Sequence, residues 1–339
     1  MIKPKKKRNK INLFEDNCIP DIQQDFKLLY KNPSGVAIRK STKPCRQQGD
    51  YDKHFIQNTF CEKRDGEFLK ENLDIGDSTP ENIKKQLIAL IKENWCCFHP
   101  EGVKVPIRDY EVIIDTGTSK PFACKNQRYG MHESVVMQKA IDGLLFKDQI
   151  GVTTKGRWLS RGTLAAKPHQ EHIMSIDDFI WRFCVNYMMV NMKTRVIAYP
   201  IPRCNDAVKM ETGNAKLCIL LDACTGYHQL KMEDQSALKT AFAGPFGRKY
   251  FYKVLPYGLV NGPTTYVIFI YDMREHWNAL AKEYNVNIGQ DNNTRIIIDD
   301  TYMFIMTHRD GLLYLKAILE ISKRYNITWK LKKCSFFPD

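Results

Sequence analysis

The stretch "TRIIIDDTYMFIM", Thr294–Met306, places two adjacent aspartates, Asp299 and Asp300, between two apolar runs. The β-branched and aromatic residues at 296–298 and 302–306 predict two short buried strands, joined by a tight turn that tolerates short polar side chains. Two neighbouring negative charges repel each other. Either solvent at an exposed hairpin tip or a bound divalent cation must therefore compensate them.

A third aspartate, Asp222, ends the apolar run "CILLD", where a buried charge is costly. A single aspartate in such a place is most often a structural cap. If its strand lies beside the hairpin, however, Asp222, Asp299 and Asp300 present the oxygen ligands that Mg²⁺ prefers. Two such ions about 3.5–4 Å apart can activate an attacking hydroxyl and stabilise a leaving pyrophosphate. We therefore expect a metal site at this sheet edge.

The composition of the chain indicates the class of partner that it binds and the compartment in which it works. The 339 residues include 51 Lys plus Arg against 38 Asp plus Glu, and a net charge of +13 favours a polyanion such as nucleic acid. No apolar run of about eighteen residues and no signal-peptide core occur, so no membrane association is expected. Eleven cysteines without a C-x-x-C pair indicate reduced thiols and an intracellular location. Cys96-Cys97 with His99 lacks the second half of a zinc motif.

The chain divides into an arm and an ordered remainder. Residues 1–78, which begin with the basic run "KPKKKRNK", are expected to form a loosely ordered N-terminal arm. Thr79-Pro80 predicts the first helix start, and a further helix is expected at Ser134–Lys147. The runs "KLCILLDA", "HQLKM" and "KYFYKVL" predict strands. Pro263 opens another helix, and Leu312 to Leu319 follow helical spacing after the hairpin. This order predicts an α+β fold, with helices on one face of an antiparallel sheet.

Several motifs together resemble one enzyme family. "LLDACTGYHQLKM", "KTAFAGPFGRKYFYKVLPYGLVNGPTTY" and "IIDDTYMF" resemble successive palm motifs of the reverse transcriptases of gypsy-type long-terminal-repeat retrotransposons. "GRWLS" and "WRFCVNYMMVNMKTRVIAYPIPR" resemble the fingers, and the likeness runs from about Thr79 to Asp339. It implies a right-hand polymerase with a lead-in helix and fingers at 79–205 and a palm at 206–339. The thumb is absent, and downstream thumb and RNase H regions of a polyprotein are expected.

The resemblance implies an RNA-directed DNA polymerase, a nucleotidyltransferase that adds dNTPs to a primer 3′-hydroxyl on an RNA or DNA template. It implies two Mg²⁺ ions, or Mn²⁺ in their place, and a cytoplasmic retroelement particle or the nucleus as location. The implied site residues are the catalytic and metal-binding Asp222, Asp299 and Asp300, the metal contact Ala223, the dNTP-binding Lys167, Arg182, Ala223, Tyr227, Tyr257 and Gly258, and Lys332 or Lys333 as general acid. Tyr227 stands at the steric-gate position, where a ring excludes a ribose 2′-hydroxyl.

Three departures from the family pattern bear on the site. Ile297 stands where a tyrosine precedes the catalytic turn, which is expected to loosen primer placement without removing a metal ligand. Asn186 and Met188 replace an acid and an arginine, so the internal ion pair of the fingers is not expected. About ten extra residues around "KEYNVNIGQDNN" are expected to form a loop before the hairpin.

Two other functions compete with polymerase activity. Asp115-Thr116-Gly117 is the catalytic triplet of aspartic proteases, but such an enzyme needs two aspartates that share a proton. We expect Asp115 to be structural or solvent-facing, without a catalytic partner. The other alternative is a truncated or domesticated palm that binds nucleic acid without extending it.

Overall fold

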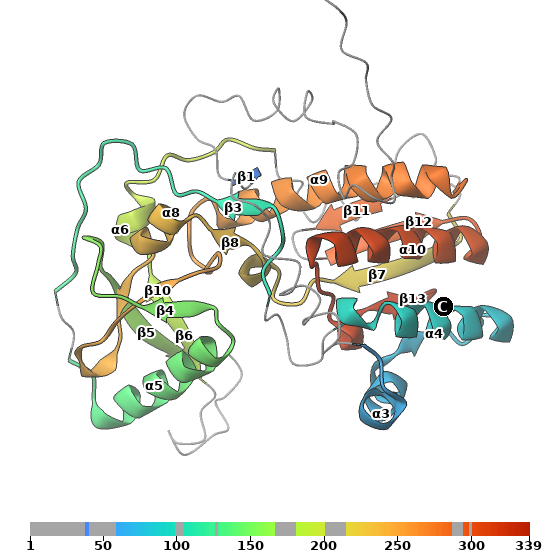
Figure 1. Cartoon of the computed structure of the whole chain (residues 1–339), viewed down its shortest axis with the longest axis horizontal. Helices are drawn as coiled ribbons and strands as arrows, with labels where there is room; N and C mark the ends of the chain where they lie inside the picture. The colour runs from blue at the N-terminus through green and yellow to red at the C-terminus, as the bar shows by residue number, and fades with distance from the viewer. Residues whose placement is uncertain are drawn as a thin grey trace, which may run out of the picture.

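The computed structural model describes residues 38–40, 59–98, 105–125, 128–166, 181–200, 215–286, 294–297 and 300–339. Lys167 and Asp299 lie outside these residues, as do the basic run at the N-terminus and most of the loop expected before the hairpin. The described elements form two groups, one at the left and one at the right of the view (Figure 1).

The right-hand group is built on a five-stranded sheet in the order β11-β12-β7-β13-β2. Its strands are β11 (Thr294–Ile297), β12 (Asp300–Ile305), β7 (Leu217–Asp222), β13 (Ser335–Phe336) and β2 (Asp74–Ile75). The pairs from β11 to β13 are antiparallel, whereas β13 and β2 pair in parallel at the edge. The predicted hairpin and its pairing with the Asp222 strand are therefore confirmed.

Two long helices accompany this sheet. α9 (Gly262–Glu283) and α10 (His308–Tyr325) lie side by side, and α10 also contacts β12 and α4 (Glu81–Glu93). Pro263 lies in the first turn of α9, as predicted from its tolerance there. Thr307 caps α10 through its hydroxyl, which accepts a hydrogen bond from the Asp310 amide at 3.1 Å. The α+β prediction, with helices packed against a mainly antiparallel sheet, is confirmed.

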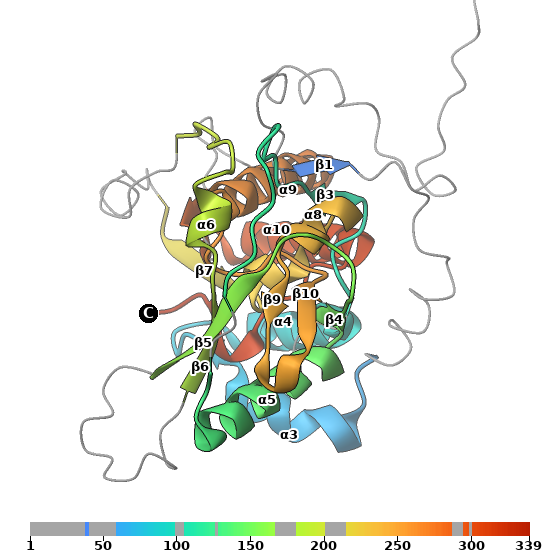
Figure 2. The ribbon, with the colours of Figure 1, turned by 90° about the vertical axis from the view of Figure 1, so that its left-hand side faces the viewer.

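The left-hand group contains a second five-stranded sheet, in the order β4-β10-β9-β5-β6. Figure 2 shows this sheet from the side, with α5 (Met131–Phe146) across one end. Its strands are β4 (Ile150–Val152), β10 (Lys249–Tyr252), β9 (Phe242–Ala243), β5 (Ser160–Ala166) and β6 (Trp181–Asn186). The predicted helix at Ser134–Lys147 is thus present but begins three residues earlier.

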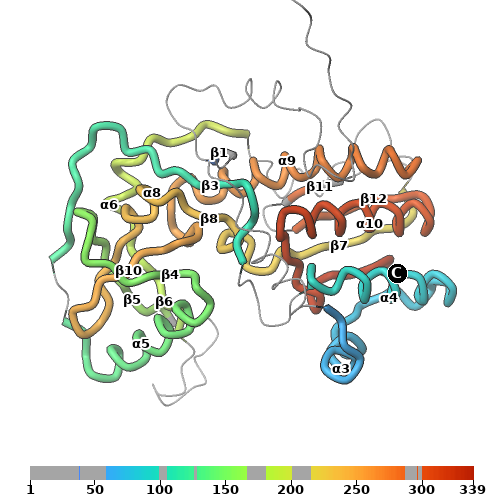
Figure 3. Tube along the Cα trace, viewed as in Figure 1, coloured from blue at the N-terminus to red at the C-terminus, as the bar shows by residue number. Residues whose placement is uncertain are grey.

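Short elements link the two groups, as the tube trace shows (Figure 3). A small sheet joins β1 (Ile38–Lys40), β3 (Tyr110–Val112) and β8 (Lys231–Met232). Other short elements are α6 (Met188–Asn191), α8 (Asp234–Lys239) and the 3₁₀ turns η1 (Trp95–Cys97), η3 (Gly226–Gln229), η4 (Pro245–Gly247) and η5 (Leu331–Lys333).

Two expectations from the sequence are wrong. Ordered structure begins before Thr79, because α3 (Glu62–Asn72) already packs its Phe68 ring edge-on against Trp95, with centroids 6.2 Å apart. Phe68 and Trp95 are 27 positions apart in the chain, so no local sequence pattern predicts their contact. The run "HQLKM" is not one strand: Thr225 adopts a left-handed conformation that starts the turn η3, and only Lys231–Met232 is extended.

Candidate active site

Asp222 and Asp300 face each other at the ends of two paired strands. Asp222 is the last residue of β7, Asp300 is the first residue of β12, and the two are direct partners in the antiparallel register. Asp222 is buried, with 8% of its surface exposed, and Asp300 is half-buried. Because neighbouring strands lie about 5 Å apart, this register brings the two carboxylates into one cluster.

The backbone on the other side of β7 fixes the position of Asp222. The amide of Lys330 donates to the Asp222 carbonyl at 2.9 Å, and the amide of Cys224 donates to the Thr328 carbonyl at 2.9 Å. Ala223 forms an isolated bridge with Trp329, which is completely buried. Asp222 and Ala223 are therefore held between β12 on one side and residues 328–330 on the other.

Charge in this cluster is partly balanced by a lysine. The Lys333 ammonium donates to Asp222 Oδ2 at 2.9 Å, so Lys333 rather than Lys332 reaches the carboxylates. Burial and the negative charge of Asp222 raise the pKa of Asp300, while Lys333 acts in the opposite direction. Two carboxylates in this arrangement repel each other, and a nearby positive charge stabilises them.

Hard oxygen donors of this kind suit Mg²⁺ or Mn²⁺. Within the described ranges, no three His, Cys, Asp or Glu side chains gather as ligands for one ion, and Asp299 lies outside those ranges. The described part of the cluster is the pair Asp222 and Asp300, which fits a divalent cation by its chemistry and its charge.

The ring of Tyr227 is enclosed by other aromatic side chains. It stacks on Tyr257 with centroids 5.0 Å apart and lies 5.5 Å from the ring of Tyr266. A Cβ atom at Gly262 would lie 3.6 Å from Tyr227 Cε2, so the start of α9 also contacts the ring. Tyr227 is 7% exposed, whereas Tyr257 is 50% exposed and presents its surface to solvent.

Gly258 follows Tyr257 in a conformation that favours glycine, with φ = +91°. Its carbonyl accepts a hydrogen bond from the Asn191 side chain at 2.8 Å, and the Val260 amide donates to Asn191 Oδ1 at 2.9 Å. Tyr266, Gly262 and Asn191 shape this region but were not predicted from the sequence. The sequence signal for Gly262 and Tyr266 was their spacing of about one helical turn, on either side of Pro263.

The remaining predicted residues lie elsewhere or outside the described ranges. Arg182 is exposed on β6 of the left-hand sheet, opposite Ala165, and Lys167 is not among the described residues. Asn186 uses its side chain locally, accepting a hydrogen bond from the Met188 amide at 3.0 Å at the start of α6. The Asn186 side chain thus orders the first turn of α6, in place of the ion pair that the family pattern has there.

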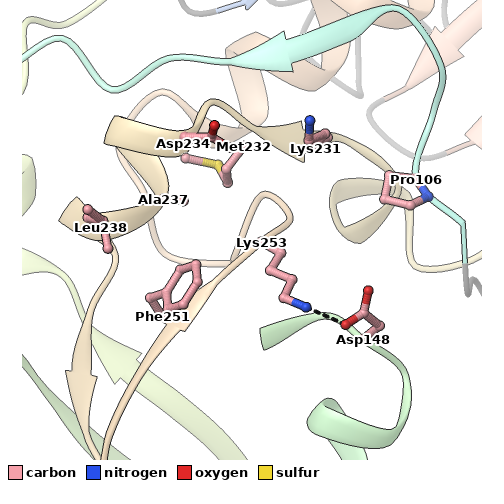
Figure 4. Close-up of a pocket in the computed structure, with 9 residues that line it drawn as sticks. All are labelled: Pro106, Asp148, Lys231, Met232, Asp234, Ala237, Leu238, Phe251 and Lys253. Carbon is pink, nitrogen blue, oxygen red and sulfur yellow. Dashed lines mark hydrogen bonds and ion pairs between the residues drawn. The ribbon is translucent and has the colours of Figure 1, made fainter. Parts of the chain in front are cut away.

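A cavity of about 370 Å³ lies between β8, α8, β10 and the turn after α5 (Figure 4). Lys253 and Asp148 form an ion pair at its edge. Its lining residues are Pro106, Asp148, Lys231, Met232, Asp234, Ala237, Leu238, Phe251 and Lys253. None of them is a predicted site residue, so the cavity is separate from the aspartate pair.

Among the helices of the described ranges, none is long and apolar enough to cross a membrane.

The region that contains the aspartates matches a known family model. Residues 179–339 match the family model described as reverse transcriptase (RNA-dependent DNA polymerase). The chain is 28% identical over 260 residues to the retrovirus-related Pol polyprotein from transposon opus of Drosophila melanogaster, which covers 76% of this chain and 24% of that protein. It is 24% identical over 261 residues to the corresponding polyprotein from transposon 412 of the same organism, with 76% and 20% covered. The chain therefore spans about a quarter or less of the length of these relatives.

Solved structures resemble the fold. The foamy viral protease-reverse transcriptase in complex with an RNA/DNA hybrid superimposes with a TM-score of 0.61 at 18% identity, covering 88% of this chain and 34% of that one. The same viral protein in complex with double-stranded DNA gives a TM-score of 0.60 at 18% identity, with 88% and 53% covered.

Proposed function

Because residues 179–339 match the family model of reverse transcriptases (RNA-dependent DNA polymerases), we propose that the protein supplies the fingers and palm of an RNA-directed DNA polymerase. We assign the lead-in and fingers to residues 79–205 and the palm to residues 206–339. The short coverage of the polyprotein relatives supports action as one part of a longer Pol-type protein.

The pairing of Asp222 with Asp300 at the ends of β7 and β12 carries this proposal. In the proposed site, Asp222, Asp299 and Asp300, with the Ala223 carbonyl, hold two Mg²⁺ ions. When bound, these ions lower the pKa of the primer 3′-hydroxyl and stabilise the charge on the leaving pyrophosphate. In this proposal Lys333, whose ammonium contacts Asp222, donates a proton to the pyrophosphate.

The Tyr227 ring supports a role in sugar selection. Its contacts with Tyr257, Tyr266 and Gly262 hold the ring in one orientation, as exclusion of a 2′-hydroxyl requires. In this proposal Tyr257 and Gly258 form the adjacent pocket surface, and Lys167 and Arg182 bind the triphosphate.

The proposed partners are a primer annealed to an RNA or DNA template, and dNTPs. The net charge of +13 suits a polyanion, and the structurally similar foamy viral enzyme has been solved with an RNA/DNA hybrid and with double-stranded DNA. The cysteines of the described ranges are free thiols, which suits a reducing compartment. A cytoplasmic retroelement particle or the nucleus is the location that we propose.

The triplet Asp115-Thr116-Gly117 supports a structural role better than a proteolytic one. The Asp115 carboxylate accepts hydrogen bonds from the Gly117 amide at 2.8 Å and from Arg195 Nη1 at 3.2 Å. An aspartate whose charge is neutralised by arginine does not share a proton with a second aspartate.

Primer extension tests the proposed function. The chain, joined to the downstream sequence of its gene, is assayed at low salt with Mg²⁺, dNTPs and a labelled primer on RNA and DNA templates. Asp222→Asn and Asp300→Asn should each abolish extension while leaving the fold and template binding intact. Asp142→Asn, which alters an exposed carboxylate on α5, is the matched control and should extend like the unmodified protein.

Two results would contradict the proposal in different ways. Undiminished extension by Asp300→Asn would remove the metal assignment. A folded unmodified protein that binds primer–template in an anisotropy titration but adds no nucleotide would support the nucleic-acid-binding alternative.

A further inference from the structure

The Asp115-Thr116-Gly117 turn is anchored to two other parts of the chain. The Ile114 amide donates to Ser236 Oγ at 2.9 Å, and Lys239 Nζ donates to the Ile114 carbonyl at 2.6 Å, which ties the turn to α8. On its other side, the Arg195 amide donates to the Asp115 carbonyl at 2.8 Å. The turn therefore connects α8 with the segment that follows α6.

The Arg195 side chain strengthens this second connection. Its Nη1 lies 3.2 Å from Asp115 Oδ2, and a Cβ atom at Gly117 would lie only 3.0 Å from Arg195 Nη2. Gly117 has φ = +51°, so both its backbone and the close guanidinium favour glycine at this position. Asp115 and Gly117 therefore both help to fix the position of the Arg195 side chain.

Arg195 is in turn bound to the start of α9. Its carbonyl accepts a hydrogen bond from Asn261 Nδ2 at 2.8 Å, and Asn261 Oδ1 accepts one from the Ile197 amide at 3.1 Å. Asn261 stands at the N-cap position of α9 but makes no side-chain cap to the helix. Its side chain is used instead to hold residues 195–197.

Asn261 lies between the two surfaces of the proposed nucleotide pocket. Before it come Tyr257 and Gly258, and after it comes Gly262, which contacts the Tyr227 ring. A displacement of Asn261 therefore moves the backbone on both sides of Tyr227. The Asp115 carboxylate binds the Gly117 amide and the Arg195 guanidinium, so its path to this pocket runs through Arg195.

We propose that Asp115, Arg195 and Asn261, here named the Asp115–Asn261 network, position the 257–262 turn and thereby set how closely the pocket fits the dNTP sugar. This inference rests on the proposed polymerase function. It makes the three residues positioning residues, not catalytic ones. Loss of the network should raise KM for dNTP and weaken discrimination against rNTP, while kcat stays nearly constant.

The expected effects follow the strength of the contacts removed. The Arg195 side chain is 52% exposed and that of Asp115 is 28% exposed, so Arg195→Met should raise KM for dNTP by about threefold to fivefold. Asn261→Asp keeps the acceptor for the Ile197 amide but turns an oxygen toward the Arg195 carbonyl, and should raise KM by about tenfold. Arg195→Lys retains the charge and should recover most of the unmodified KM.

A matched control comes from another exposed acid–base pair. Asp148 and Lys253 form an ion pair whose side chains are 58% and 42% exposed, and the Asp148 carboxylate binds Lys253 rather than Arg195 or Asn261. In double-mutant cycles, Asp115→Ala and Asn261→Asp should be non-additive in KM for dNTP, whereas Asp148→Ala and Asn261→Asp should be additive.

Hydrogen exchange provides a readout that does not require activity. In the chain of 339 residues, Arg195→Met and Asp115→Ala should each speed amide exchange in a peptide covering residues 257–265, and Asp148→Ala should not. Unchanged exchange there in Arg195→Met, or additivity in the Asp115 cycle, would overturn the network. An unmodified protein without primer extension would contradict the proposed function, and the exchange result would still decide whether the network exists.

Discussion

The Lys333 ammonium lies 2.9 Å from Asp222 Oδ2, at the place where Asp222 pairs with Asp300 across β7 and β12. The lysine is more than half exposed, and the aspartate side chain is 11% exposed. This contact brings a positive charge next to two facing carboxylates and so reduces their mutual repulsion.

The first prediction concerns this lysine. In EDTA, Lys333→Gln should lower Tm by about 1–3 °C, because an exposed ion pair contributes little but leaves two carboxylates uncompensated when it is lost. Added Mg²⁺ should then raise Tm more in Lys333→Gln than in the unmodified protein, since no ammonium competes with the ion. Thermal unfolding with and without Mg²⁺ measures both effects. Lys332→Gln, at the exposed neighbouring position, should behave like the unmodified protein; equal responses of the two variants would contradict the prediction.

The strands around this contact could be predicted because their signals are local. Apolar residues on both sides of Asp300 and before Asp222 indicate buried strands, and a charge at each end indicates where the strands stop. The choice between Lys332 and Lys333 could not be made in this way. It depends on the 3₁₀ turn Leu331–Lys333, which directs only one of the two adjacent side chains toward β7.

Contacts between distant segments could not be predicted from the sequence, for a different reason. Asp115 and Arg195 are 80 positions apart, and β2 pairs with β13 across about 260 positions. Neither pair carries a periodic pattern, since β2 and β13 have two residues each and Asp115 lies in a turn. Such pairings are decided by the packing of whole elements, which local composition does not reveal.

A second prediction concerns pH. Burial, with a smaller effect of the Lys147 charge, lowers the pKa of His228 from its ordinary 6.5 to about 4. The folded state therefore keeps His228 neutral while the unfolded state takes up a proton, so stability falls as pH drops from 6.5 toward 4. Between pH 7.5 and pH 5 this should remove about 2 kcal/mol from the free energy of unfolding.

Urea unfolding of the unmodified protein and of His228→Gln at both pH values checks this. The loss between pH 7.5 and pH 5 should be smaller in the variant, whatever its stability at pH 7.5, because glutamine does not titrate. The ring of His228 lies 5.0 Å from that of Tyr257, so the lost stability arises beside the proposed pocket. Equal losses in the two proteins would show that His228 titrates alike in both states.

A third prediction concerns Tyr227. Tyr227→Val should increase rNTP incorporation relative to dNTP in primer extension, because the smaller side chain leaves room for a 2′-hydroxyl. It should also reduce stability by about 2–4 kcal/mol, since the ring packs between Tyr257 and Tyr266. Tyr227→Phe retains the ring and should keep the unmodified selectivity. Equal dNTP preference in the valine and phenylalanine variants would remove Tyr227 from sugar selection.

The last prediction concerns residues 59–98, which lie before the region that matches the family model. Six of these residues are at most 2% exposed: Leu87, Ile91, Asn94, Trp95, Cys97 and Phe98. Their elements α4 and η1 contact α10. Furthermore, the Trp329 amide donates to the Cys97 carbonyl at 2.7 Å, and Trp329 bridges Ala223 beside Asp222. We therefore expect the palm to require this segment for stability.

A chain of residues 59–339 should unfold cooperatively, whereas residues 105–339 should bind a hydrophobic dye and lack a sharp thermal transition. Because the shorter chain can fail to accumulate, point variants give a graded test in the full sequence. Ile91→Ala should lower the free energy of unfolding by about 2–4 kcal/mol through the lost contact with α10. Gln86→Ala, exposed on the same helix, should change it by less than about 0.5 kcal/mol. A cooperative transition in residues 105–339 at the Tm of the longer chain would show that the palm folds without the segment.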